Sequence, residues 1–145
     1  MKPGEENEVC KMIAGVFDEF VGSGYSPEGV AEFMKYCDPA AMAARREGHF
    51  TLIAECQGLI AGAIEVRNNE HISLFFVLKE FHSRGIGGKL FQAALEKIAA
   101  ETGGKQKMTV NSSPFAVKIY EKLGFVQTEP ETTINGIVFV PMERT

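Results

Sequence analysis

Residues 71–91 read HISLFFVLKEFHSRGIGGKLF, and they decide the fold of this chain. Their first part, HISLFFVL at 71–78, is β-branched and aromatic and predicts a strand. Their second part, FHSRGIGGKLF at 81–91, is glycine-rich and leads into an amphipathic helix predicted from Gly85 to about Thr102. A glycine-rich turn at the start of a helix is suited to phosphate, because free backbone N–H groups and the positive end of the helix dipole meet there.

Three kinds of phosphate loop fit a glycine-rich turn. A P-loop needs a hydroxyl residue after its lysine to hold Mg²⁺, but Leu90 follows Lys89 here. The dinucleotide fingerprint needs a third glycine, but Leu90 and Phe91 occupy that region, and the preceding strands look antiparallel. The remaining candidate is a diphosphate bound at the N-terminus of the helix that starts at Gly85, where the glycines let the backbone approach closely.

Helices are predicted before residue 49. Apolar residues at helical spacing predict a helix over 5–22. Ser26-Pro27 then has the pattern of an N-cap followed by a first-turn proline, and this second helix should end at Asp38-Pro39. A short alanine-rich helix should follow to about Arg46.

The pattern changes to strands at residue 49. Residues 49–56, 57–67 and 71–78 predict a three-stranded antiparallel meander, with turns at Gln57-Gly58 and Asn68-Asn69. Beyond the helix that starts at Gly85, the sequence predicts a strand at 105–111, a helix from Ser113-Pro114 to Leu123 capped by Gly124, and a closing antiparallel pair formed by FVQT (125–128) and INGIVFVPM (134–142). The predicted class is α/β (α+β), with a mixed, mostly antiparallel central sheet and helices on both faces.

Composition indicates one domain spanning residues 1–145. The net charge of −4 argues against a nucleic-acid partner, and no apolar run approaches the roughly 20 residues of a membrane span. The acidic start MKPGEENEV is unlike a signal peptide. Cys10, Cys37 and Cys56 show no paired spacing, which favours buried thiols in a reducing cytoplasm, so we expect a cytoplasmic protein with no metal in its site.

The glycine loop resembles the pyrophosphate loop of the GNAT N-acetyltransferases, [Q/R]-x-x-G-x-[G/A], read here as His82-Ser83-Arg84-Gly85-Ile86-Gly87. The Gln or Arg of the family is His82 in this chain, which leaves the backbone cradle intact. Val77 matches a strand-end valine of the family, and Asn111, Ala116 and YEKLGF (120–125) match a second block. The resemblance covers about residues 5–141, but the predicted first helix begins within a few residues of Met1, so the short strand that usually opens the fold is either absent or truncated.

The resemblance implies acetyl-CoA as the acyl donor and a sheet splayed where that donor binds. It also implies that the strand before the loop bulges and pairs its backbone with the pantetheine arm, with one N–H directed at the acyl oxygen. The implied donor-binding residues are Phe75, Phe76, Val77, His82, Arg84, Gly85, Ile86, Gly87, Gly88, Lys89, Asn111 and Tyr120.

Catalytic roles follow from the resemblance for two residues. Tyr120 matches the tyrosine that protonates the leaving sulfur, although it could instead be a packing residue beside Leu123. His71 lies where many members carry a carboxylate base, and strand alternation puts His71, Ser73 and Phe75 on one face and Ile72, Leu74 and Phe76 on the other. Glu65, Glu70, Glu28 or a water chain are alternatives for the base, and Asn111 could cap a helix rather than bind the donor.

The acceptor side is less defined by sequence. In the family, the two N-terminal helices and the closing hairpin frame this side, which here means Tyr25, Glu28, Phe33 and residues 130–138. The implied function is transfer of acetyl from acetyl-CoA to a primary amine by direct attack in a ternary complex. A small amine, a peptide N-terminus or a lysine side chain are open as acceptors, and a homodimer is possible. The alternative is a CoA-binding sensor without transferase activity.

Overall fold

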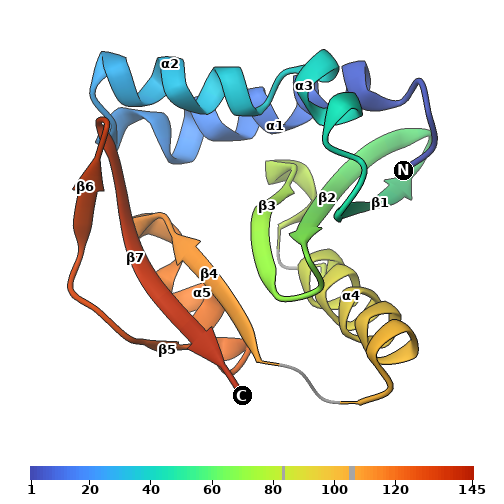
Figure 1. Ribbon diagram of the computed structural model, residues 1–145. Coiled ribbons are helices and arrows are strands. Elements are labelled where there is room, and N and C mark those ends of the chain that lie inside the picture. The colour runs from blue at the N-terminus through green and yellow to red at the C-terminus, as the bar shows by residue number, and fades with distance from the viewer. Residues whose placement is uncertain (83, 105–106) are drawn as a thin grey trace.

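The computed structural model describes residues 1–82, 84–104 and 107–145. The strands form one mixed sheet in the order β1-β2-β3-β4-β7-β5, and β6 pairs with β7 beside this path (Figure 1). The strands are β1 (His49–Cys56), β2 (Leu59–Arg67), β3 (His71–Val77), β4 (Met108–Ser112), β5 (Val126–Gln127), β6 (Thr132–Ile134) and β7 (Ile137–Arg144). The helices are α1 (Glu6–Phe20), α2 (Pro27–Tyr36), α3 (Pro39–Ala44), α4 (Ile86–Thr102) and α5 (Val117–Lys122), with short 3-10 turns at Gly22–Gly24, Lys79–Phe81 and Pro114–Ala116.

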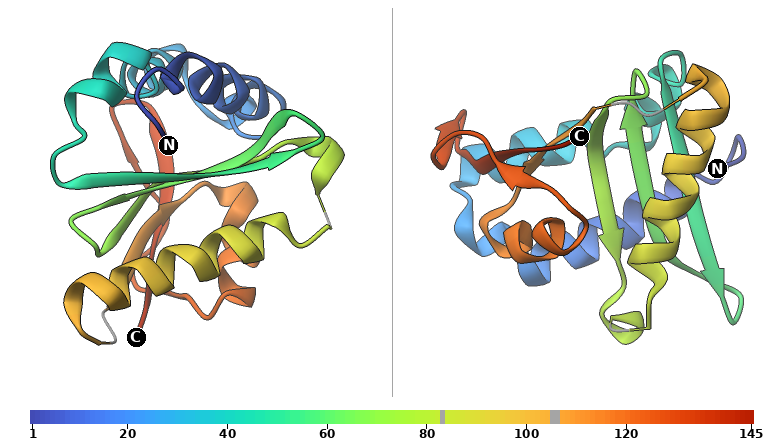
Figure 2. Two further views of the ribbon diagram at one scale, coloured as in Figure 1. Left: turned by 90° about the vertical axis from the view of Figure 1, so that its right-hand side faces the viewer. Right: turned by 90° about the horizontal axis from the view of Figure 1, so that it is seen from below.

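Helices cover both faces of the sheet, as predicted (Figure 2). The face of β2 and β3 that carries Ala63 and Leu74 packs on α1, where it meets Val9 and Ile13. The opposite face packs on α4 and α5 in a second cluster, which contains Ile64, Ile72, Phe91, Met108, Tyr120 and Phe125. These two cores hold β2 and β3 from both sides, so the positions of these two strands are fixed.

The predicted helix boundaries are close to the observed ones. The Ser26 hydroxyl accepts a bond of 3.1 Å from the Gly29 N–H and caps α2, with Pro27 in its first turn. Asp38 caps α3 in the same way through the Ala41 N–H. The predicted 5–22 helix is shorter, because α1 ends at Phe20 and the chain continues as a 3-10 turn.

Three tight turns connect the antiparallel strands. Gln57-Gly58 and Asn68-Asn69 both have positive φ at each central residue, which is the backbone of a type I′ hairpin turn. The meander that they join is therefore confirmed. Asn135-Gly136 forms a third such turn between β6 and β7, and β6 was not predicted as a separate strand.

The C-terminal elements are also close to the prediction. The strand predicted at 105–111 is observed as β4 from Met108, and residues 105–106 lie outside the described residues. The helix predicted from Ser113 divides into a 3-10 turn and α5, and Gly124 follows with φ of 97°. As predicted, β5 pairs with β7 in an antiparallel arrangement. In the part of the chain described before α1, no strand is present, so the opening strand of the resemblance is absent there.

The sheet divides between β3 and β4. These two strands are parallel neighbours but are paired only at His71 with Thr109 and at Ile72 with Val110. Beyond these residues they diverge, and Figure 1 shows the two halves of the sheet opening toward α1 and α2. The end of β3 therefore has an edge that no neighbouring strand covers.

A bulge in β3 corrects the predicted alternation. Against β2, Leu74 pairs with Glu65 and Ile72 pairs with Val66, so Ser73 is an extra residue. Ile72 consequently packs on the α4 side whereas Leu74 packs on the α1 side, and the prediction that they share a face is wrong. The bulge itself is what the resemblance implied.

The described part of the chain holds no helix with the length and apolarity that a membrane crossing requires. Cys10 and Cys37 are buried free thiols, and Cys56 is only half-buried. The prediction of three buried thiols is therefore wrong for Cys56, which lies at the end of β1 beside the Gln57-Gly58 turn.

Candidate active site

A cavity of about 970 Å³ fills the opening between β3 and β4. Its walls come from β3, β4, the N-terminus of α4 and α5 on one side, and from α1, α2 and the β6–β7 hairpin on the other. Most of the lining is apolar and much of it aromatic, including Phe17, Phe33, Phe75 and Phe139. The cavity thus joins the glycine loop to the helices that the sequence associated with an acceptor.

The glycine loop lies at one end of this cavity. Gly85 has φ of 78°, a left-handed conformation that glycine adopts without strain, and it directly precedes α4. The first intrahelical bond runs from the Lys89 N–H to the Gly85 carbonyl at 3.0 Å, so the N–H groups of residues 86–88 have no partner within the helix. Gly85, Ile86, Gly87 and Gly88 all line the cavity. Ser83 of the motif lies outside the described residues.

His82 fixes the loop to the end of β3. Its Nε2 lies 2.8 Å from the Val77 carbonyl oxygen. A carbonyl can only accept, so Nε2 carries the proton and donates it. The His82 ring also packs against Phe20, which in turn stacks on Phe115. His82 therefore holds the loop in place by a contact that its position in the motif did not reveal.

The backbone of β3 presents two residues to the opening. The Leu78 N–H donates to the Ala61 carbonyl at 2.8 Å, so Leu78 points its backbone toward the β2 side. Since backbone groups of alternate residues face the same edge, Phe76 also faces β2, whereas Phe75 and Val77 face the opening. Phe75, Phe76 and Val77 all lie on the cavity wall, but only Phe75 and Val77 direct backbone groups into the cavity.

Tyr120 lies in α5 with its ring packed between Phe75 and Phe125. It is 7% exposed and lines the cavity. Burial raises the pKa of its phenol well above the ordinary value, because the phenolate would be poorly solvated. The phenol is therefore protonated at neutral pH and can act only as a proton donor or a hydrogen-bond partner.

His71 lies at the start of β3, on the cavity wall. Its Nδ1 is 2.7 Å from the Thr109 hydroxyl, which itself lies 3.5 Å from the Glu70 carbonyl oxygen. Burial lowers the pKa of His71 below 6.5, and the nearby Arg67 guanidinium lowers it further. The imidazole is therefore neutral at pH 7 and has a lone pair.

Of the remaining predicted donor-binding residues, one lines the cavity and two do not. Asn111 is exposed on the cavity wall, and the cap that it could have supplied comes instead from Ser113, whose hydroxyl accepts from the Ala116 N–H at 3.2 Å. Arg84 and Lys89 are exposed and do not line the cavity. The Arg84 guanidinium lies over the Phe81 ring at 5.4 Å.

The acceptor side is partly as predicted. Tyr25 and Phe33 line the cavity, as do residues 134, 135 and 137 of the closing hairpin, whereas Glu28 does not. Of the alternative bases, Glu70 is exposed and outside the cavity lining. Glu65 is 1% exposed and bonded to Arg45 at 3.1 Å, so it is an engaged carboxylate rather than a free base.

Sequence reasoning missed a polar cluster beside the acceptor side. Tyr36 and Ser73 both line the cavity, and both hydroxyls donate to Glu65 Oε1, at 2.9 and 2.7 Å. Arg45 completes the cluster from the end of α3. The signal available in the sequence was Glu65, a charged residue in the otherwise apolar run of β2.

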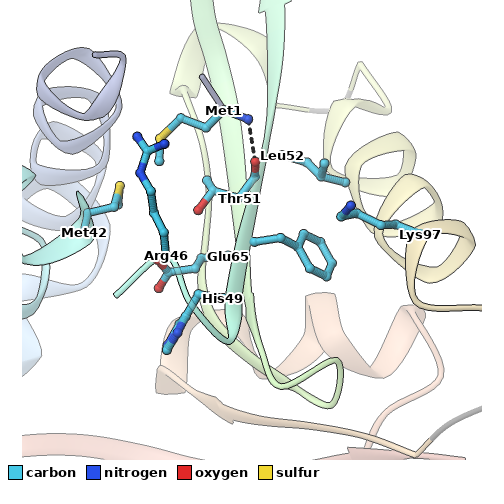
Figure 3. Close-up of a pocket in the computed structure, with 9 residues that line it drawn as sticks. Met1, Met42, Arg46, His49, Thr51, Leu52, Glu65 and Lys97 are labelled. Atoms are coloured by element: carbon cyan, nitrogen blue, oxygen red, sulfur yellow. Dashed lines mark hydrogen bonds between the residues drawn. The ribbon is translucent and has the colours of Figure 1, made fainter. Parts of the chain in front are cut away.

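A smaller hollow of about 300 Å³ lies on the other side of Glu65, next to the N-terminus (Figure 3). The Met1 amine donates to the Thr51 carbonyl at 2.7 Å, and Arg46 pairs with Glu6. Burial lowers the pKa of the Met1 amine. The first contact joins the N-terminus to β1, and the second joins α1 to the segment before β1. The hollow does not include the glycine loop.

Residues 21–145 match the family model described as an acetyltransferase (GNAT) domain. The chain belongs to the GNAT acetyltransferase family. The family predicted from the glycine loop and YEKLGF is thereby confirmed, and the chain is an acyltransferase of this family. No curated protein matches this GNAT acetyltransferase.

Solved structures share the fold of this GNAT acetyltransferase over almost its whole length. A GCN5-related N-acetyltransferase from Rhodopseudomonas palustris is 27% identical, with a TM-score of 0.82 over 100% of this chain and 92% of that chain. PaiA N-acetyltransferase from Thermoplasma acidophilum, in complex with coenzyme A, is 16% identical, with a TM-score of 0.79 over 99% and 94%. An aminoglycoside 6′-acetyltransferase type Ii is 15% identical, with a TM-score of 0.70 over 99% and 91%.

Proposed function

We propose that this GNAT acetyltransferase moves the acetyl group of acetyl-CoA to a primary amine by direct attack within a ternary complex. The observation that carries the proposal is the single cavity that joins the N-terminus of α4, the uncovered edge of β3 and the Tyr120 phenol. A diphosphate, an extended amide arm and a thioester need these features in this order. The complex of PaiA N-acetyltransferase with coenzyme A supports the same type of donor.

The residues of the α4 N-terminus suit the diphosphate. The N–H groups of residues 86–88 have no partner within the helix, and the helix dipole adds positive potential there. A Cβ on Gly85 or Gly88 would meet no described atom within 4 Å, so the space beside them is open. Bound acetyl-CoA would supply the activated thioester, and the loop would orient it.

The edge of β3 suits the arm and the acyl oxygen. Phe75 and Val77 direct backbone groups to the opening, where a bound amide arm could pair as an added strand. The Val77 carbonyl already accepts from His82, so its second lone pair remains for the arm. The Phe75 N–H, just after the bulge, is the donor that we assign to the acyl oxygen as charge develops on it.

Two side chains would move protons. His71 would accept the proton of the attacking amine at Nε2 when Nδ1 donates to the Thr109 hydroxyl. Tyr120 would donate its phenolic proton toward the departing sulfur. Because burial raises the Tyr120 pKa, this transfer is uphill and its contribution is modest.

A CoA-binding module without activity is the second candidate. The glycine loop and the β3 edge would serve such a module equally well. The transferase is favoured because binding alone gives no reason for a buried phenol and a neutral imidazole to line the same cavity.

Gly87→Glu tests the donor site. A Cβ on Gly87 would lie 3.8 Å from Phe75 and Val77, which is ordinary contact, so the fold should tolerate the change while the carboxylate occupies the diphosphate position. We expect calorimetry to show at least a tenfold loss of acetyl-CoA affinity. Gln92→Glu is the matched control, because it adds the same charge to the exposed face of α4. Equal affinity of Gly87→Glu and wild type would contradict the assignment.

A further inference from the structure

The acceptor side of the cavity contains an arrangement of hydroxyls that the proposed mechanism does not use. Tyr36, on α2, and Ser73, the bulged residue of β3, reach the same oxygen of Glu65 from different elements. Both residues line the cavity, whereas Glu65 does not line it and is 1% exposed. The cavity wall at this point therefore contains two residues whose hydroxyls bond to a buried carboxylate.

The protons of the Tyr36 and Ser73 hydroxyls are both used in hydrogen bonds to Glu65. Glu65 is held by Arg45, whose Nε lies 3.1 Å from Oε2 and whose Nη2 lies 3.2 Å from Oε1. An ionised carboxylate can only accept, so Tyr36 and Ser73 must both donate to it. Each hydroxyl has one proton, and what remains toward the cavity is its lone pairs.

The cluster is also rigid. The Arg45 guanidinium lies 3.7 Å from the centre of the Tyr36 ring, and its Nη1 donates to the Tyr36 carbonyl at 2.6 Å. Ser73 lies in the bulge, where its Oγ is within 3.3 Å of the Glu65 carbonyl as well as of the side chain. Such an arrangement loses little entropy when a ligand binds.

We propose that the Tyr36 and Ser73 hydroxyls form the seat of the acceptor's amino group and accept its N–H hydrogens. This inference rests on the proposed function. A primary amine attacks the thioester with its lone pair, so its two hydrogens need acceptors, and this wall presents acceptors without a spare proton. Once the N–C bond has formed, the positively charged nitrogen releases one of these hydrogens as the proton that His71 Nε2 accepts. Ser73 precedes the Phe75 N–H by two residues, so an amine held here lies beside the position assigned to the acyl oxygen.

The charge and the surface around the seat define the class of amine. Glu65 and Arg45 form an ion pair, so the seat has no net negative charge to attract a polyamine with several ammonium groups. It therefore suits a neutral amine. The neighbouring walls are aromatic, and Arg67 and Lys122 line the same cavity as cations. The cavity lining also contains the Glu32 carboxylate, which is paired with Lys35 at 3.3 Å. The acceptor is therefore a primary monoamine on an apolar carbon skeleton, not a polycation.

The test compares Ser73→Ala and Tyr36→Phe with wild type, using 2-phenylethylamine and hexylamine as acceptors and thiol release as the readout. Each variant removes one acceptor, so KM for the amine should rise about three- to tenfold while acetyl-CoA affinity and kcat change less than twofold. Ser112→Ala is the control, because Ser112 is not among the residues that line the cavity and its buried hydroxyl donates to the Ser113 carbonyl, so KM should be unchanged.

Four outcomes would count against the seat. An unchanged KM in both variants overturns it, and an equal loss of acetyl-CoA affinity reduces the cluster to structural support. If wild type acetylates spermidine but neither 2-phenylethylamine nor hexylamine, the assigned class of acceptor, a primary monoamine, is overturned. No turnover of any amine by wild type contradicts the proposed function itself, and the seat falls with it.

Discussion

The backbone of Gly29 in α2 lies directly against the backbone of Gly136 in the β6–β7 turn. A Cβ built on Gly29 would overlap the Gly136 carbonyl, and one built on Gly136 would overlap the Ser26 hydroxyl. This contact joins α2 to the closing hairpin, and both elements line the acceptor side of the cavity. Gly136 also has φ of 79°, so glycine is needed there for two reasons.

Gly29→Ala should therefore destabilise the protein. The added methyl meets backbone rather than a flexible side chain, so α2 or the hairpin must shift, at a cost of roughly 1–3 kcal/mol. Thermal unfolding measures the loss. Gly15→Ala is the matched control, since Gly15 is exposed in the interior of α1 with open space around it and should gain about 0.5–1 kcal/mol. A Gly29→Ala protein as stable as wild type would show that the contact can relax freely.

Tyr120→Phe should separate the transferase from a binding module. The change keeps the ring between Phe75 and Phe125 but removes the proton. We expect unchanged acetyl-CoA affinity and a kcat lower by about 10²-fold, the lower end for general acids, because a thiolate leaves readily. Thiol release and calorimetry on both proteins give the two numbers. Equal turnover would make Tyr120 a packing residue.

His71→Gln should change the pH dependence of kcat/KM. The pKa of His71 is lowered below 6.5. The imidazole therefore becomes protonated, and stops acting as a base, only when the pH falls below this lowered pKa. With an acceptor amine of high pKa, log kcat/KM in wild type should rise with a slope that approaches 2 in this acidic range and 1 above it. The variant should be slower and keep a slope of 1 throughout. A wild-type slope of 1 at every pH would return the role to water.

The lowered pKa of His71 also predicts how acid affects the stability of the fold. The folded pKa of His71 is below the unfolded value of about 6.5, so the unfolded chain takes up the proton first as the pH falls. The stability contribution is present above pH 6.5 and is lost as the pH falls below it. Urea unfolding from pH 7.5 to 5 should therefore show a smaller loss for His71→Gln than for wild type. Parallel losses would mean that His71 is solvated.

The sequence by itself determined the features that depend on neighbouring residues. Ser26-Pro27 predicts a helix start because a cap bonds to the backbone three residues later. Asp38-Pro39 predicts the end of that helix because proline cannot continue it. Gln57-Gly58 and Asn68-Asn69 predict hairpins because these residues tolerate positive φ. The loop before α4 and the block YEKLGF predict the family for the same reason, since each is a short continuous segment.

Only the tertiary structure decided how the site is assembled. The bulge at Ser73 reverses the simple alternation of β3, and it depends on the register with β2 rather than on a local preference. The His71–Thr109 bond spans 38 positions, and the Tyr36–Glu65 bond spans 29. Such contacts depend on how α2, β2, β3 and β4 pack, because two residues distant in the chain meet only when the cores on both faces of the sheet have formed.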